Sequence, residues 1–254
     1  METRYRVWLD GMPPPPQVTV LNVLEQPVYA PALTSQRPGG GSFYSGGQRS
    51  ALQLTLSLWL RQRNPSLREQ SLEALRRWAL GRRLTLSTRP GCCLRVRCDQ
   101  LPAHSALCWA ETLTLRFTAW ETPWWQSEQP TRLCLAGETA AEVLRLPGSA
   151  PTPVSAGFRA VDGGLNRLSL SVGETQLRFE GLSLAAGERL TVEQGDDGWQ
   201  RLRLWRQNGA AEQAAAFRTA DSDDAWQAIP GANQVLLAAD AAVEARLWAR
   251  GRWL

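Results

Sequence analysis

Leucines at alternate positions constrain the fold of this chain more than any other feature. Leu52, Leu54, Leu56, Leu58 and Leu60 are separated by single residues, namely Gln53, Thr55, Ser57 and Trp59. Successive side chains of a β-strand point to opposite faces, so a period of two places all of these leucines on one face. The segment therefore predicts a β-strand with one face packed into a core.

A single helix is expected directly after this strand, at Ser66 to Leu80. Asn64 suits the N-cap, Pro65 the first helical position and Gly81 the position just past the end. An apolar stripe runs along the segment, made of Leu67, Leu72, Leu75, Trp78 and Ala79. The basic residues Arg76 and Arg77 fall near the C-terminal end, where they complement the helix dipole.

The rest of the first half predicts further strands. Alternation from Tyr5 to Leu9 indicates a strand that ends before Pro13–Pro16, because proline cannot donate to a β-ladder. The other expected elements are an irregular strand (Val18 to Tyr29), a hairpin (Leu84 to Leu86 with Cys93 to Cys98) and a long closing strand (Leu107 to Trp120). The first half should thus be β-rich with one helix.

A domain boundary is expected near residue 128. Alternation stops at Glu121 to Trp125, and a new series of short strands begins after Pro130, which divides the chain into domains 1–128 and 129–254. The second domain has no helical period, and glycine-containing turns separate its strands, as in an antiparallel β-sandwich. Its expected strands include Arg132 to Leu135, Val143 to Leu146, Ala215 to Thr219, Gln234 to Ala238 and Val243 to Arg250. The predicted fold class is mainly β.

The segment from Thr34 to Gln48 is predicted to be a long flexible arm. It carries five glycines around Phe43 and Tyr44. Loops longer than about 12 to 15 residues inside a compact domain are usually functional or disordered. A plain surface loop is the alternative, but two aromatic residues in a glycine-rich arm favour docking onto a partner.

Composition excludes several classes of protein. The 28 basic residues are all arginine and are interspersed with 24 acidic ones, so the net charge is only +4 and nucleic-acid sequence recognition is not expected. The longest apolar run, around Ala51 to Leu60, falls well short of the roughly 20 residues that span a bilayer, so no membrane insertion is expected. With no recognisable secretion signal, the five cysteines are expected to be free thiols: Cys92, Cys93, Cys98, Cys108 and Cys134.

The residues do not predict a catalytic, cofactor or metal site. The one histidine, His104, lies in an expected turn, and the cysteines lack the paired spacing of a zinc site. The acidic groups Asp196-Asp197 and Asp221 to Asp224 are interpreted as turn caps, with Ca²⁺ binding as the alternative. Trp199 and Trp205 could stack on sugar rings, although core packing is favoured for such residues. We therefore expect a non-enzymatic structural protein without a cofactor.

Several motifs resemble the distal tail protein (Dit) family of siphophages and related prophages. The C-terminal half carries Gly181-Leu182-Ser183-Leu184, Gly187 to Glu193, Pro230-Gly231-Ala232-Asn233-Gln234-Val235 and the closing Ala249-Arg250-Gly251-Arg252-Trp253-Leu254. These segments are similar to the galectin-like domain of that family, and the Pro-Gly-x-Asn turn is the most specific. The arm, long strand, single helix and the exit Phe117 to Trp125 resemble its N-terminal belt domain in their order.

The resemblance implies a hexameric ring at the tip of a phage tail. Belt domains would form the ring, galectin-like domains would project from it, and the ring would join the tail tube to the tail-tip hub near the tape measure protein. It implies a virion protein assembled in the host cytoplasm. Candidate assembly contacts are Arg37, Phe43 and Tyr44 in the arm, and Arg250 and Arg252 as ion-pair formers. It does not imply sugar binding, because galectins use a histidine-bearing motif, and a carbohydrate-binding adhesin module is kept as the alternative function.

Overall fold

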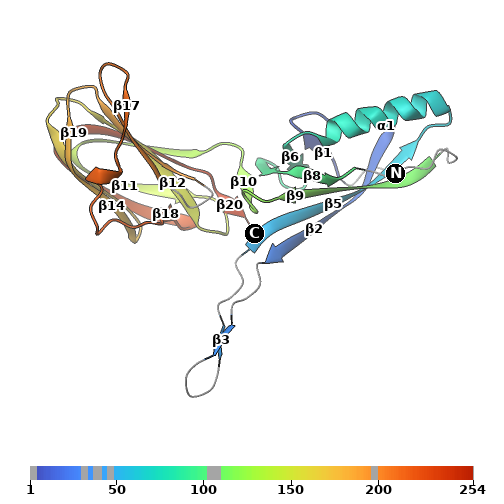
Figure 1. Ribbon diagram of the computed structural model, residues 1–254, viewed down its shortest axis with the longest axis horizontal. Coiled ribbons are helices and arrows are strands. Elements are labelled where there is room, and N and C mark those ends of the chain that lie inside the picture. The colour runs from blue at the N-terminus through green and yellow to red at the C-terminus, as the bar shows by residue number, and fades with distance from the viewer. Residues whose placement is uncertain are drawn as a thin grey trace. The chain divides into compact units, whose positions relative to one another are not determined.

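The computed structural model describes residues 5–29, 49–101, 110–195 and 200–253, and the backbone of residues 34–36 and 42–44. The predicted fold class is confirmed, because strands dominate the described residues and the one α-helix is α1 (Pro65–Ala79) (Figure 1). The chain divides into two compact units, Met1–Trp125 and Gln126–Leu254.

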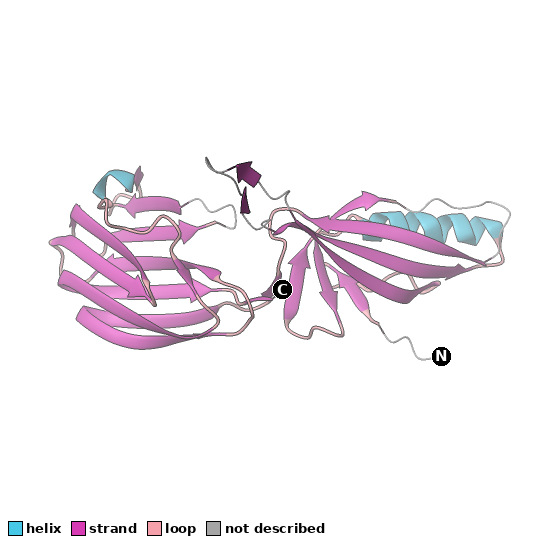
Figure 2. Ribbon diagram, turned by 90° about the horizontal axis from the view of Figure 1, so that it is seen from below, coloured by secondary structure: helices cyan, strands magenta, loops and turns pink. Residues whose placement is uncertain are grey.

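The first unit is built on a four-stranded antiparallel sheet. Its strand order is β2 (Val18–Tyr29), β5 (Arg49–Arg61), β9 (Ala110–Ala119) and β8 (Arg97–Gln100). The alternating leucines, Leu52 to Leu60, lie on β5 and are at most 1% exposed, which confirms the predicted one-sided strand. Helix α1 lies along this sheet (Figure 2).

Helix α1 begins where the sequence predicts. The Asn64 side-chain oxygen accepts hydrogen bonds from the backbone N–H groups of Ser66 (3.0 Å) and Leu67 (3.3 Å). The reason for Gly81 differs from the expected one, because its φ is not in the left-handed region. A Cβ on Gly81 would instead lie 2.8 Å from the Cβ of Leu9. The glycine therefore permits close approach of the helix end to β1 (Val7–Leu9).

The predicted strand from Cys93 to Cys98 is divided between two sheets. β7 (Cys92–Arg95) pairs with β6 (Arg83–Leu86), which pairs with β1, whereas β8 pairs with β9. Val96 lies between β7 and β8, and its backbone N–H donates to the carbonyl of Arg82 at 2.8 Å. The prediction of one strand was wrong because alternation in a sequence does not reveal a change of pairing partner.

The β2–β5 ladder ends at the pair Tyr29 and Arg49. Within the segment between them, β3 (Thr34–Gln36) and β4 (Ser42–Tyr44) pair antiparallel, with Ser35 opposite Phe43. The remainder of the predicted arm lies outside the described residues.

One long bent hairpin organises the second unit. β11 (Thr131–Leu146) and β19 (Gly231–Ala249) pair along their whole lengths, with a register shift between Gly137 and Thr139. The other edge of β19 pairs with β13 (Leu165–Val172) near its start and with β12 (Thr152–Ala160) near its end. Two layers therefore extend from the same hairpin. One consists of β13 and β14 (Thr175–Leu184), and the other of β12, β15 (Arg189–Gln194), β16 (Gln200–Trp205) and β17 (Ala211–Gln213).

The core of the second unit lies between these layers. Its largest buried side chains are Phe158 from β12, Phe179 from β14 and Trp226, which precedes β18 (Gln227–Ala228). All strand pairs in this unit are antiparallel, so the predicted antiparallel sandwich is confirmed. The remaining strands are β10 (Trp125–Ser127) and β20 (Arg252–Trp253).

Three details of the predicted second domain were wrong. The segments expected as two strands each, at 132–146 and at 234–250, form the single strands β11 and β19, because the bulge near Gly137 bends the hairpin without ending it. The strand expected at Ala215 to Thr219 contains the 3₁₀ helix η1 (Ala215–Phe217) instead. Within this segment, Arg218 forms an isolated bridge with Phe179, and the N–H of Thr219 donates to the carbonyl of Arg178 at 3.0 Å, so its backbone contacts β14.

Candidate functional site

The root of the arm is a cluster of arginine, tryptophan and glutamate side chains, Glu25, Arg49, Arg89, Trp124 and Trp125, here called the arm-root cluster. Arg49 occupies the last described pair before the arm. Its guanidinium lies over the Trp124 ring, 4.9 Å from the ring centroid, where a cation is attracted to the aromatic face. Burial lowers the pKa of Arg49, although the nearby Tyr29 and Glu25 oppose this shift.

Glu25 connects the other members of the arm-root cluster. Its Oε2 atom accepts hydrogen bonds from the Arg89 guanidinium at 3.2 Å and from the Trp125 indole N–H at 3.1 Å. The Arg89 guanidinium also lies 5.2 Å from the Trp125 ring centroid. Trp125 is fully buried, while Glu25 and Arg89 are 28% and 32% exposed. The cluster thus fixes the strands from which the arm departs.

The arrangement at the arm root suits attachment rather than catalysis. The Glu25 carboxylate accepts from the Arg89 and Trp125 donors, and none of the five is a histidine, cysteine, serine or threonine nucleophile. Across the part of the chain that the structure describes, no group of three His, Cys, Asp or Glu residues is placed to hold a metal ion. No described helix is long and apolar enough to cross a membrane.

Of the five residues predicted as assembly contacts, the structure describes the side chains of two, Arg250 and Arg252. Arg37 lies outside the described residues, and Phe43 and Tyr44 are described only as backbone of β4. Arg250 is exposed, and its guanidinium donates to the carbonyl of Ser127 at 2.9 Å and also to that of Glu128. Arg252 is only 9% exposed.

Asn233 explains the Pro-Gly-x-Asn motif at the start of β19. Its side chain is 2% exposed, and its Oδ1 accepts a hydrogen bond from the N–H of Ile229 at 2.9 Å. The Nδ2 group donates to the carbonyl of Ile229 at 2.8 Å and to that of Gly231 at 3.3 Å. Gly231 has a φ of 99°, in the region that favours glycine. The motif therefore forms a buried turn whose shape is held by one amide side chain.

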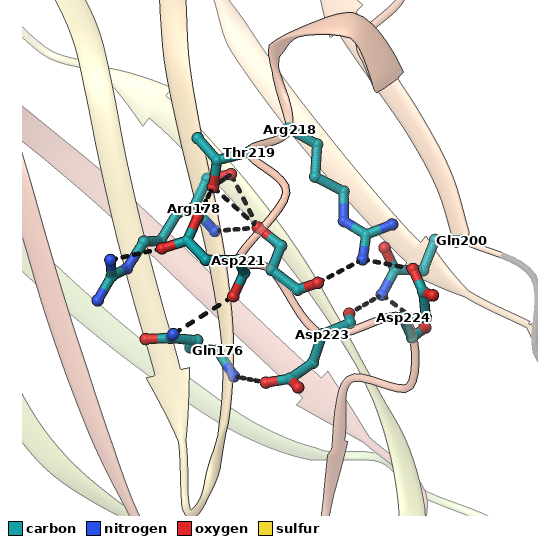
Figure 3. Close-up of polar contacts among 9 residues, drawn as sticks. Gln176, Arg178, Gln200, Arg218, Thr219, Asp221, Asp223 and Asp224 are labelled. Carbon is teal, nitrogen blue, oxygen red and sulfur yellow. Dashed lines mark hydrogen bonds and ion pairs between the residues drawn. The ribbon is translucent and has the colours of Figure 1, made fainter.

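The acidic loop Asp221 to Asp224 caps a turn, as the sequence analysis favoured (Figure 3). Asp221 pairs with the Arg178 guanidinium at 2.6 Å, and Asp224 pairs with that of Arg218 at 2.7 Å. Asp223 accepts a hydrogen bond from the backbone N–H of Gln176 at 2.7 Å. These bonds direct the three carboxylates to protein donors, as expected of residues that cap a turn. Asp196 and Asp197 lie outside the described residues.

Residues 214–224, here called the strap, join the free edges of the two layers. On one edge, Asp223 and the Ser222 hydroxyl accept from the backbone N–H groups of Gln176 and Arg178 on β14. On the other edge, the N–H of Ala214 donates to the carbonyl of Leu202 on β16 at 3.0 Å. Edge strands expose unpaired backbone groups, so the strap protects both edges and closes the sandwich opposite the β11–β19 hairpin.

The remaining residues that the sequence singled out have varied positions. Trp205 is half-buried on the outer face of β16 rather than in the core, and Trp199 and His104 lie outside the described residues. Cys93 is buried, whereas Cys134 is exposed and Cys98 half-buried, and these three thiols are free. Burial raises the pKa of the Cys98 thiol. Cys108 lies outside the described residues.

Comparison with known proteins identifies the fold. No protein-family model matches the chain, and no curated protein matches it in sequence. The crystal structure of the phage SPP1 Dit protein (gp 19.1), described as a paradigm of the hub adsorption apparatus in phages that infect Gram-positive hosts, matches with a TM-score of 0.68 at 15% identity, covering 97% of this chain and 98% of that one.

Two chains from the phage P2 baseplate also match, but only weakly. The chain from the activated conformation with Ca covers 97% of each chain at 9% identity and a TM-score of 0.45. The chain from the structure with Sr covers 96% of this chain and 97% of that one at 9% identity and a TM-score of 0.44. The fold assignment rests on the SPP1 protein alone. Over nearly its whole length, this chain has the fold of a siphophage distal tail protein.

Proposed function

We propose that this chain is a structural component of a phage tail tip, where six copies form a ring that joins the tail tube to the tail-tip hub and the host-recognition apparatus. The observation that carries this proposal is the fold shared with the SPP1 Dit protein along 97% of the chain. In the proposed ring, residues 1–128 form the belt and residues 129–254 the projecting galectin-like domains. The tape measure protein lies nearby, and the particle is assembled in the host cytoplasm. No enzymatic activity is proposed.

The arm-root cluster supports a role for the arm in ring assembly. A closed ring of identical subunits uses two different surfaces of each subunit, so one element must reach the neighbouring copy. The arm departs from strands that are held by Glu25, Arg49 and Arg89. Arg37, Phe43 and Tyr44 are the proposed contact residues on it. Of the two C-terminal arginines, Arg250 is proposed to lie at an assembly surface because it is exposed, whereas Arg252 is nearly buried.

Native mass spectrometry and negative-stain imaging of the purified full chain test the proposal, alone and with the tail tube and hub proteins. The expected result is a ring of six copies. Deletion of residues 36–48 should weaken ring formation while circular dichroism shows that the monomer remains folded. A chain that stays monomeric under all of these conditions would overturn the proposal.

A pair of point variants separates the arm root from general effects of charge. Arg49→Gln removes the contact with Trp124 and should reduce the fraction of chains in rings. Arg95→Gln makes the same change at an exposed residue of β7 in the same unit and should leave that fraction unchanged. Equal effects of the two variants, or rings that survive deletion of the arm, would contradict the role assigned to the arm.

A further inference from the structure

The outer face of the layer β19–β12–β15–β16 carries arginines and tryptophans in register. Core positions alternate with outward positions on each strand. One row of directly paired outward residues crosses all four strands, and it consists of Arg246 on β19, Gly157 on β12, Thr191 on β15 and Arg203 on β16. Neighbouring strands lie about 4.8 Å apart, which separates the backbones of Arg246 and Arg203 by about 14 Å. A glycine and a threonine thus lie between two arginines.

Two indole rings approach the centre of this row from opposite sides. A Cβ on Gly157 would lie 3.8 Å from the ring of Trp248, so that ring lies beside the glycine on the outer face. From the other side, the indole N–H of Trp205 donates to the hydroxyl of Thr191 at 3.1 Å, which fixes the orientation of that ring. Both tryptophans are half-buried and keep part of their surface open to solvent. Together they form an aromatic platform across Gly157 and Thr191.

Arginines surround the platform in excess over acidic residues. The exposed arginines of the adjoining rows are Arg132, Arg159 and Arg189, in addition to Arg203 and Arg246. Arg159 lies 3.6 Å from Glu244 in an exposed ion pair. Within the described part of the chain, none of the other four forms an ion pair. One further opposite-charge pair, Glu193 and Arg201, lies at the end of the face and leaves the excess unchanged.

We propose that this face, here called the platform face, binds an anionic glycan, with sugar rings against Trp205 and Trp248 and carboxylate or phosphate groups on the surrounding arginines. Exposed aromatic rings bury the apolar faces of sugars, and guanidinium groups bind oxyanions through two parallel hydrogen bonds. The proposal concerns the second unit alone. It holds whether or not the chain forms a ring.

The acidic residues on the platform face favour a glycan over a nucleic acid. Glu244 and Glu193 would repel a nucleic acid, because its backbone carries one negative phosphate per nucleotide. A DNA backbone also has no hydroxyl groups that could donate to these carboxylates. A glycan offers many hydroxyl groups, which can donate hydrogen bonds to the carboxylates and to the Thr191 hydroxyl oxygen. The same face thus fits a polymer with spaced negative charges and neutral hydroxyls between them.

Binding of the full chain to four polymers tests the proposal by biolayer interferometry: polygalacturonate, neutral dextran, poly-L-glutamate and a thymidine oligonucleotide. Polygalacturonate should bind best, and dextran and poly-L-glutamate at least about tenfold more weakly, because each lacks one of the two recognised features. Absence of polygalacturonate binding would overturn the proposal. Equal or tighter binding of poly-L-glutamate or the oligonucleotide would overturn it in favour of an acidic protein or a nucleic acid.

Variants place the binding on the platform face. Trp248→Leu should weaken polygalacturonate binding about tenfold, and Trp248→Phe, which keeps an aromatic ring, should lose less. The double variant Arg203→Gln with Arg246→Gln should also weaken binding and reduce its dependence on salt. The matched control, Arg145→Gln with Arg167→Gln, removes two exposed arginines from β11 and β13. Two results would refute the location of the binding site on the platform face. One is a control variant that weakens binding as much as the platform variants do. The other is unchanged binding by platform variants that circular dichroism shows to be folded.

Discussion

The guanidinium of Arg68 and the carboxylate of Glu111 lie 2.8 Å apart, with 5% and 13% of their side chains exposed. The pair joins helix α1 to strand β9 in the first unit. Removing one member of a buried pair is strongly destabilising because the other charge loses that partner, so Arg68→Met should lower the free energy of unfolding by about 3 to 5 kcal/mol. Urea denaturation of the purified chain measures this loss.

The double variant Arg68→Met with Glu111→Leu provides the control for that prediction. It replaces both charges with apolar side chains, which is often neutral or stabilising for buried pairs. The double variant should therefore recover most of the stability that the single variant loses. The geometry indicates that the two residues are coupled, and equal instability of the single and double variants would contradict this.

Glu25→Leu should destabilise the first unit. The Arg89 guanidinium and the Trp125 indole N–H would both lose their acceptor, and an unsatisfied buried donor costs about 1 to 3 kcal/mol. Trp125→Phe removes only one donor and leaves no buried N–H behind, so its cost should be smaller. Chemical denaturation of the two variants compares these costs, and the reverse order would show that packing of the indole outweighs its hydrogen bond.

Glu188 should make the stability of the second unit depend on pH. It is 8% exposed, and the hydrogen bond from the Ala185 N–H, followed by those from Arg206 and Gln207, holds its pKa below the ordinary value against the effect of burial. A carboxyl with a depressed folded-state pKa contributes stability above its unfolded pKa of about 4.3. This contribution is lost as the pH falls through the folded-state pKa.

Glu188→Gln tests this dependence directly. The difference in unfolding free energy between the native chain and the variant should be largest above about pH 5 and should shrink as the pH falls below about 4.3. Glu142→Gln changes an exposed residue of β11 in the same unit and serves as the control. If the difference in unfolding free energy for Glu188→Gln does not depend on pH, the pKa of Glu188 is not lowered by folding.

The sequence predicted the elements that depend on local pattern. The alternation at Leu52 to Leu60 and the cap at Asn64 are properties of neighbouring residues, and both are confirmed. The segment from Ala215 was predicted wrongly because its structure depends on backbone groups of β14, which no local pattern reveals. Similarly, β11 appeared as two strands because a bulge interrupts alternation without interrupting pairing.

The arm-root cluster was missed for the same physical reason. Glu25, Arg49, Arg89 and Trp125 come from four separate segments, and only the fold brings them together. The Trp124-Trp125 pair after Pro123 was noticed as the exit of the first half, and this was the one local signal of the cluster. Of the platform face, only Trp205 was singled out, since the outward positions of four strands become one surface only when their register is known.

Gly251→Ala should destabilise the second unit. A Cβ at this buried position would lie 2.9 Å from the Cγ of Pro147 and still closer to the Pro147 carbonyl oxygen. Such overpacking costs about 1 to 3 kcal/mol. Gly157→Ala is the control, because its added Cβ would meet Trp248 at an ordinary 3.8 Å. Thermal denaturation should show a lower Tm for Gly251→Ala and an unchanged Tm for Gly157→Ala. An unchanged Tm for Gly251→Ala would show that the backbone at Gly251 and Pro147 can move apart at little cost.

The long hairpin also governs when the second unit can fold. β11 and β19 pair from Thr131 with Ala249 to Leu146 with Gly231, so the pair that carries both layers closes a long loop formed by residues 147–230. Contacts between residues so far apart in sequence form slowly and late. During synthesis, β11 must therefore wait on the ribosome with its apolar positions uncovered until β19 has emerged. A chain cut short before β19 would expose these positions to proteases and chaperones, which gives the cell a means to discard incomplete copies.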